Sequence, residues 1–353
     1  MLVQLAEMGS IPVMDTGGDL NFPNTHLLDV TGTDAVTRSD VIVLLDVEKL
    51  EQTFTVSNRY TREKNSRLQP GCKVVNIGLF DQWIKSTTLD FDRLWPVEYT
   101  IAADTSLAIP RLTEELRRIL ESEPQQKKTL EERFNRTKGL HDATRGRWKQ
   151  QLERDGNRED ISLATLSQEV WNCVKGERWI VTGNIGGFTR GLWDLDRPGS
   201  VMGGQKAAGL GTALSRSIGA SLAVRKDGGF CVAFIGDGES LYVPSSIWTA
   251  VHHHIPLLVL LLDNGGYVGE GAHVTWASES RNRSTANQHI ATEIQNPRVD
   301  FAALARAQGA YAEGPIEKRS DLRPAMERAF QVMKKESTLA LVDVRLKGRE
   351  QQA

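Results

Sequence analysis

Two short polar motifs hold the side chains of this sequence that are best suited to chemistry. Asp237 lies in a Gly-Asp-Gly-Glu motif at 236–239, and Asn264 lies in an Asp-Asn-Gly-Gly motif at 263–266. Carboxylate and amide oxygens are hard ligands, which suit Mg²⁺ or Ca²⁺ better than zinc. Mg²⁺ needs few such protein ligands, because phosphate oxygens and water complete its octahedron. The two motifs therefore predict a magnesium site, provided that the fold brings them together.

The segments around these motifs predict how they meet. Each motif directly follows an apolar run of strand length, Phe230–Ile235 or Leu257–Leu262, and a helix is expected between them over Pro244–His252. The two strands joined by this helix form a parallel pair, whose carboxyl ends lie side by side where open α/β sheets bind ligands. Gly236 and Gly238 let the backbone approach a phosphate closely. The helix start near Pro244 would offer free N–H groups to an anion. We call the two motifs the clasp and interpret it as a site for a metal and a diphosphate.

The first part of the chain predicts a small α/β domain over residues 1–122. Ile11–Met14 is typical of a short strand, and the apolar runs in Asp40–Asp46 and Lys73–Gly78 predict two more. The near-continuous run in Asp40–Asp46 is typical of a strand buried on both faces. Strands that alternate with helices indicate a parallel sheet.

A charged stretch separates this domain from a second one. Between 121 and 160, 19 of 40 residues are charged, nine acidic and ten basic. Such mixed charge favours a solvated helical linker, which we assign to 123–162. From 163 to 353 strands and helices alternate again, with a glycine-rich loop over Gly183–Gly191 and a helix over Leu210–Val224. The predicted fold class is α/β, with two three-layer domains that are each built on a parallel sheet.

Composition excludes several classes of protein. The formal net charge is −2, so the chain lacks the basic excess of a nucleic-acid-binding protein. The longest apolar run, Ile255–Leu262, has eight residues, whereas a membrane span needs about 20. The three cysteines are far apart in sequence, and the N-terminus does not resemble a secretory leader. We therefore expect a cytoplasmic protein with no membrane or nucleic-acid partner.

The motifs and their spacing resemble the diphosphate-binding domain of the thiamine diphosphate enzymes, whose fingerprint is Gly-Asp-Gly followed by Asn-Asn. Lys206–Leu214 and Ser217–Ala220 resemble a helix start in the benzoylformate decarboxylase and acetolactate synthase relatives. Residues 1–120 resemble their central domain, and the likeness extends to pyruvate decarboxylases. The resemblance implies a Rossmann-like central domain and a thiamine diphosphate-binding domain. It also implies the cofactors thiamine diphosphate and Mg²⁺.

The resemblance assigns roles to individual residues. The metal ligands would be the side chains of Asp237 and Asn264 and the carbonyl oxygen of Gly266. Leu210 matches a large aliphatic residue that props the cofactor in a bent conformation. Glu270 falls where pyruvate decarboxylases keep an active-site glutamate, and a solvated loop carboxylate is the alternative interpretation. The expected cofactor-binding set is Gly183, Asn184, Ala208, Gly209, Leu210, Gly236, Asp237, Gly238, Glu239, Asn264, Gly266 and Tyr267.

The sequence departs from the family pattern in two respects. Asp263 stands where the family has its first asparagine, which adds a negative charge beside the site. The pyrimidine-binding domain of the family, which supplies an activating glutamate, has no counterpart among these residues.

The resemblance implies a lyase or transferase of the 2-oxoacid decarboxylase and carboligase group. It would cleave or form a C–C bond next to the carbonyl of a 2-oxoacid or related substrate, as a homo-oligomer. One alternative is a catalytically silent or split-enzyme subunit that needs a partner chain with the pyrimidine domain. Another is a 2-hydroxyacyl-CoA lyase-like enzyme.

Overall fold

A computed structural model describes residues 1–16, 18–47, 50–58, 60–61, 63–79, 94–183, 186–203 and 209–346. The chain divides into two compact units, Met1–Gly17 with Asn21–Gly146 and Gly18–Leu20 with Arg147–Ala353. The division falls within a helix of 30 residues, α4 (Gln126–Asp155), which contains much of the charged stretch. The domain boundaries at 122 and 163 stay predictions.

The first unit contains a parallel sheet of three strands in the order β1-β4-β5. Its other elements are short helices, two longer helices and an antiparallel pair, β2 with β3. The bounds are α1 (Leu2–Gly9), a 3-10 helix (Ala35–Arg38), β1 (Val41–Leu45), α2 (Leu50–Phe54), β2 (Thr55–Ser57), β3 (Lys64–Ser66), β4 (Lys73–Gly78), β5 (Tyr99–Ala102) and α3 (Thr105–Ser122). The strand predicted over Ile11–Met14 is wrong, because Val13 forms only an isolated bridge with Asp29.

Strand β1 is buried on one face only. The Val41 and Val43 side chains are 52% and 48% exposed, whereas Leu44 is buried. Side chains alternate between the two faces of a strand, so residues 41 and 43 share the open face. The prediction that this apolar run is buried on both faces is wrong, because an apolar run does not show whether a helix covers each face.

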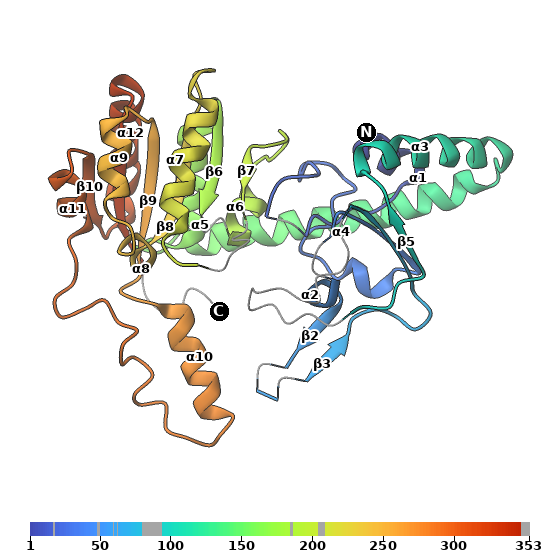
Figure 1. Cartoon of the computed structure of the whole chain (residues 1–353), viewed down its shortest axis with the longest axis horizontal. Coiled ribbons are helices and arrows are strands. Elements are labelled where there is room, and N and C mark those ends of the chain that lie inside the picture. The colour runs from blue at the N-terminus through green and yellow to red at the C-terminus, as the bar shows by residue number, and fades with distance from the viewer. Residues whose placement is uncertain are drawn as a thin grey trace. The chain divides into compact units, whose positions relative to one another are not determined.

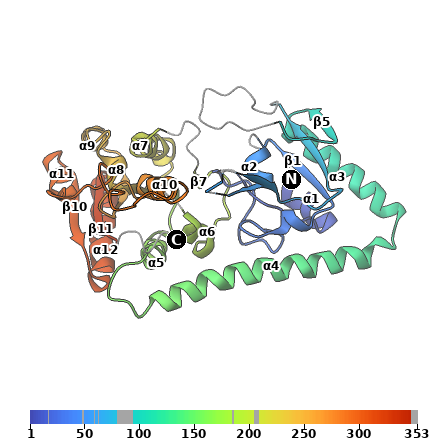
Figure 2. The same ribbon diagram turned by 90° about the horizontal axis from the view of Figure 1, so that it is seen from below.

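The second unit is built on a parallel sheet of six strands in the order β10-β11-β9-β8-β6-β7 (Figure 1). Helices cover both faces, with α5 and α12 on one side and α7 and α9 on the other (Figure 2). The bounds are α5 (Leu163–Val174), β6 (Trp179–Gly183), α6 (Gly186–Leu192), β7 (Val201–Met202), α7 (Thr212–Arg225), β8 (Phe230–Gly236), α8 (Asp237–Ser240), α9 (Ser246–His252), β9 (Leu257–Asp263), α10 (Val268–Glu279), α11 (Phe301–Ala307), β10 (Tyr311–Ile316), α12 (Arg319–Glu336) and β11 (Leu339–Arg345). The α/β class with parallel sheets is confirmed.

The central strands β8 and β9 are buried on both faces. Val232 and Phe234 of β8 pack into one core layer, and Ala233 and Ile235 pack into the other. All seven residues of β9 are buried. A parallel strand in this position reads as a continuous apolar run, which is why the sequence predicts both strands well.

One local prediction in this unit is wrong, and one predicted helix starts two residues later than expected. Most of the glycine-rich loop expected over Gly183–Gly191 belongs to α6, which begins at Gly186. A Cβ on Gly187 or Gly191 would lie within 2.5 Å of the Trp148 ring, so these glycines let a helix pack closely against an aromatic side chain. The helix expected from Pro244 begins at Ser246, and a shorter helix, α8, starts directly within the clasp.

The described residues include no helix that could span a membrane, and two of their cysteine thiols have a strongly raised pKa. None of the described helices combines the length and the apolar character needed to cross a bilayer. All three cysteines are free. Burial raises the pKa of Cys231 to about 12 and that of Cys173 to about 11, so both are poor nucleophiles at neutral pH.

Candidate functional site

The two motifs of the clasp lie side by side at the carboxyl ends of β8 and β9 (Figure 1). The strands are hydrogen-bonded neighbours, with Gly236 opposite Leu262. The Asp237 Oδ2 atom accepts the backbone N–H of Gly265 at 2.7 Å and that of Gly266 at 2.8 Å. The first motif therefore contacts the second directly, as the crossover connection predicts.

Asp237 is a buried carboxylate held by backbone donors. Its side chain is 2% exposed, and Oδ1 accepts the Gly238 N–H at 2.7 Å. Burial raises the pKa of Asp237 to about 6, and the charge of Asp263 adds to the rise, while the backbone hydrogen bonds lower it. A cation bound here would stabilise the ionised form, because it supplies the opposite charge that the buried carboxylate lacks.

Asn264 carries a buried oxygen that has no hydrogen-bond partner, its side-chain Oδ1 atom. A buried oxygen without a partner costs about 1–3 kcal/mol. We therefore expect a ligand to bind the Asn264 oxygen. The carbonyl oxygen of Gly266 accepts the Val268 N–H at 3.0 Å and retains a second lone pair. A carboxylate, an amide and a carbonyl oxygen together fit Mg²⁺.

The protein ligands alone would not complete the coordination of a metal ion. Among the described residues, no group of three or more His, Cys, Asp or Glu side chains gathers to hold one. A cation at Asp237 and Asn264 would need further oxygen atoms from water or from a ligand such as a diphosphate.

Glycines shape the backbone around the clasp. The turn after β9, residues 264–267, which we call the clasp turn, has φ angles of 81° at Gly265 and 153° at Gly266. A Cβ on Gly266 would lie 2.2 Å from the Thr292 carbonyl oxygen. At the end of β6, Gly183 has a φ of 84°, and a Cβ there would lie 2.0 Å from the Phe234 carbonyl oxygen. Only glycine fits these conformations.

Tyr267 covers the first motif of the clasp. Its hydroxyl donates to the Gly238 carbonyl oxygen at 3.3 Å, and a Cβ on Gly238 would lie 2.4 Å from its ring. Tyr242 packs edge-on against this ring, with centroids 6.5 Å apart. The structure therefore brings Gly238, Asp237 and Tyr267 together, as the predicted cofactor set requires.

Glu239 directs its carboxylate to the start of α7. The side chain is 7% exposed, and Oε1 accepts the Ala213 N–H at 3.0 Å in the first turn of that helix. The carboxylate occupies a donor at the positive end of a helix dipole, where an anionic ligand would also be favoured. Contact of Glu239 with a diphosphate stays a prediction.

For Gly209, Leu210 and Glu270 the structure shows no contact that defines a role. Leu210 is 40% exposed and, with the half-buried Gly209, precedes α7. Glu270 is exposed in the first turn of α10, so the interpretation as a solvated carboxylate stays open. Asn184 and Ala208 lie outside the described residues.

The sequence analysis missed the residues that neutralise the extra charge at Asp263. This side chain is fully buried, and its two oxygens accept hydrogen bonds from Arg298 Nη2 at 2.7 Å and Nε at 3.1 Å. Arg345 Nε lies 3.4 Å from Oδ2. Neither arginine is close to Asp263 in sequence, and no local signal pairs them.

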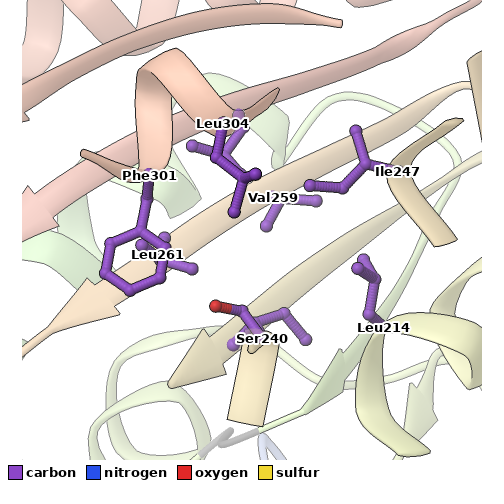
Figure 3. A pocket seen from close by; sticks show the side chains of 9 residues that line it. Leu214, Ser240, Ile247, Val259, Leu261, Phe301 and Leu304 are labelled. Carbon is purple, nitrogen blue, oxygen red and sulfur yellow. The ribbon is translucent and has the colours of Figure 1, made fainter. Parts of the chain in front are cut away.

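An internal cavity in the same unit is too small to be an alternative site (Figure 3). It has a volume of about 10 Å³, which is at most the space of one water molecule. Apart from Ser240 its lining is apolar: Leu214, Ile235, Ile247, Val259, Leu261, Phe301, Leu304 and Leu341. We interpret it as a packing gap of the core.

Residues 182–344 match the family described as the thiamine pyrophosphate enzyme, C-terminal TPP binding domain. The second unit therefore contains a TPP-binding domain of the thiamine pyrophosphate enzymes. The matched range contains both motifs of the clasp, so the family resemblance of the sequence is confirmed.

The curated proteins similar to this chain include a decarboxylase and an acetyltransferase. Benzoylformate decarboxylase of Pseudomonas aeruginosa is 30% identical over 137 residues, which cover 39% of this chain and 24% of the relative. Sulfoacetaldehyde acetyltransferase of Alcaligenes xylosoxydans xylosoxydans is 26% identical over 165 residues, which cover 46% of this chain and 25% of the relative. Each match therefore spans about a quarter of the relative's length.

Solved structures of the family share the fold of almost the whole chain. The thiamine diphosphate-dependent 4-hydroxybenzoylformate decarboxylase of Rhodococcus jostii matches with a TM-score of 0.64 and 17% identity, over 99% of this chain and 58% of that one. Benzoylformate decarboxylase of Polynucleobacter necessarius matches with a TM-score of 0.62 and 14% identity, over 98% and 58%. The chain thus spans a little over half the length of these structures.

Replacing Gly266 with alanine is expected to weaken Mg²⁺-dependent binding of thiamine diphosphate about tenfold or more, because the added Cβ forces the clasp turn away from the Thr292 carbonyl. Isothermal titration measures the affinity. Gly269→Ala is the matched control, since a Cβ on Gly269 meets no atom within 4 Å. Equal affinities for Gly266→Ala and the parent would contradict the proposed role of the turn.

Proposed function

We propose that this chain binds thiamine diphosphate through a Mg²⁺ ion held by Asp237, Asn264 and Gly266, and that it acts in the 2-oxoacid decarboxylase and carboligase group. The observation that carries this proposal is the unpartnered Asn264 Oδ1 beside the buried Asp237 carboxylate, inside a TPP-binding domain. When bound, the cofactor supplies an electron sink for breaking or making a C–C bond next to a carbonyl group.

The residues of this chain would bind and orient the cofactor. Asp237 and Asn264 would fix its diphosphate through the metal, and the glycine at 238 lets the Tyr267 ring pack closely against the first motif of the clasp. The exposed Leu210 is available to contact the cofactor rings. Glu270, also exposed, is the residue proposed to exchange a proton with the substrate. The proposed substrate is a 2-oxoacid or a related carbonyl compound.

We also propose that the protein forms a homo-oligomer and that it resides in the cytoplasm. Exposed apolar side chains on α7 and α9, Leu222 at 42% and Trp248 at 53%, support a homo-oligomer. The free thiols of all three cysteines support a reducing, cytoplasmic compartment.

The test has two steps, binding and turnover. Titration of the chain with thiamine diphosphate is expected to show binding that requires Mg²⁺, and decarboxylation of pyruvate or benzoylformate is then assayed. Turnover supports the proposed enzyme. Binding without turnover assigns the chain to a cofactor-binding subunit that needs a partner domain. Absence of Mg²⁺-dependent binding overturns the proposal.

A further inference from the structure

The clasp turn is held by a distant segment of the chain, residues 292–298. The Tyr267 N–H donates to the Thr292 carbonyl oxygen at 2.7 Å, and the Ile294 N–H donates to the Gly265 carbonyl oxygen at 2.9 Å. An isolated antiparallel bridge joins residues 266 and 293. The turn therefore has backbone partners that lie outside both β9 and α10.

Arg298 strengthens this contact with its side chain. Its Nη2 and Nε atoms donate to the two Asp263 carboxylate oxygens at 2.7 and 3.1 Å, and Nη2 also donates to the Asp263 carbonyl oxygen at 3.4 Å. The Asp263 Oδ1 atom in turn accepts the Gly265 N–H at 3.2 Å. One bidentate pair thus connects the distant segment with the backbone of the clasp turn.

Water cannot easily replace Arg298 in this position. The Asp263 side chain is 1% exposed and the Arg298 side chain 29%. Arg345 also lies near Asp263, at 3.4 Å, but it makes a shorter contact of 2.8 Å with the exposed Glu317. Removing one partner of a buried ion pair leaves an uncompensated charge, so Arg298 is the principal counter-charge of Asp263.

We propose that Arg298 is a positioning residue that acts through Asp263 to fix the clasp turn and, with it, the Asn264 and Gly266 oxygens. Asp263 is then a structural anion and no metal ligand. The identity of the bound cation rests on the proposed function, whereas the ordering of the turn does not.

Hydrogen exchange of the cofactor-free protein tests the ordering directly. In R298Q, the amides of residues 264–267 are expected to exchange about tenfold faster or more, while those of β1 and β4 in the other unit keep their rates. R298K keeps the charge but loses the bidentate geometry, so it is expected to give an intermediate rate. Mg²⁺-dependent affinity for thiamine diphosphate should fall about 10–100-fold in R298Q, as for other residues that orient metal ligands.

R323Q is the matched control, because Arg323 pairs with Glu169 at 2.8 Å on an exposed surface. If the turn amides of R298Q exchange as slowly as those of R323Q, the inference is overturned. If R298Q does not fold, the intermediate rate expected for R298K decides the same question, and a parent-like rate there overturns the inference. The turn amides of R298Q could exchange faster while the parent shows no Mg²⁺-dependent binding of thiamine diphosphate. In that case the inference about Arg298 stands and the proposed function is wrong.

Discussion

Replacing Asp343 with asparagine is expected to remove a large pH dependence from the stability of the second unit. Asp343 of β11 is fully buried, and neither of its carboxylate oxygens has a hydrogen-bond partner. Burial raises the pKa of Asp343 from 3.8 to about 7. The charges of Asp263 and Asp300 add to this rise, and those of Arg345 and Arg298 oppose it.

The sign of the effect follows from proton binding. Because the folded protein holds the Asp343 proton more tightly than the unfolded chain does, the free energy of unfolding falls as pH rises through the range from about 4 to about 7. The full effect is about 4 kcal/mol at 1.36 kcal/mol per pH unit, of which about 3 kcal/mol falls between pH 5 and pH 8. Asparagine cannot ionise, so this contribution disappears in Asp343→Asn.

Denaturant unfolding of the parent and of Asp343→Asn at pH 5 and pH 8 measures the difference. Between pH 5 and pH 8, the free energy of unfolding is expected to fall by about 3 kcal/mol more in the parent than in the variant. Asp227→Asn is the control, because Asp227 forms an exposed ion pair with Arg178 at 2.9 Å. Parallel pH curves for the parent and Asp343→Asn would show that Asp343 ionises like an exposed carboxylate.

Replacing Asp237 with asparagine is expected to weaken Mg²⁺-dependent binding of thiamine diphosphate about 100-fold or more, because the only carboxylate of the proposed metal site is lost. The fold should persist, since the asparagine side-chain oxygen can still accept the backbone N–H groups of Gly265 and Gly266. Isothermal titration gives the affinity, and a thermal unfolding curve checks the fold. Asp227→Asn again provides the control. Parent-like affinity in Asp237→Asn would remove this residue from the metal site.

The positions of Asp237 and Asn264 at the ends of two neighbouring strands could be predicted, because the pattern that indicates them lies in nearby residues. The apolar runs before Asp237 and Asn264 are long enough for buried strands, and one helix between them fixes a parallel pair. The parallel α/β fold follows from the same pattern.

Contacts between distant residues could not be predicted. Arg298 reaches Asp263 across 35 positions, and only the folded backbone shows the pairing. The exposure of Val41 and Val43 depends on which elements cover β1, which an apolar run does not reveal. Asp343 could have been noticed in the sequence, because it is the one charged residue in the apolar segment Leu339–Val344. A single carboxylate inside a predicted buried strand indicates a perturbed pKa.

The most direct measurement is the anomalous scattering of Mn²⁺ in crystals of this chain grown with Mn²⁺ and thiamine diphosphate. Mn²⁺ prefers the same oxygen ligands as Mg²⁺, and unlike it gives a strong anomalous signal. We expect one peak within bonding distance of the Asp237 carboxylate, the Asn264 side-chain oxygen and the Gly266 carbonyl oxygen. A peak elsewhere with these three oxygens unliganded, or no peak under conditions in which thiamine diphosphate is bound, would contradict the account.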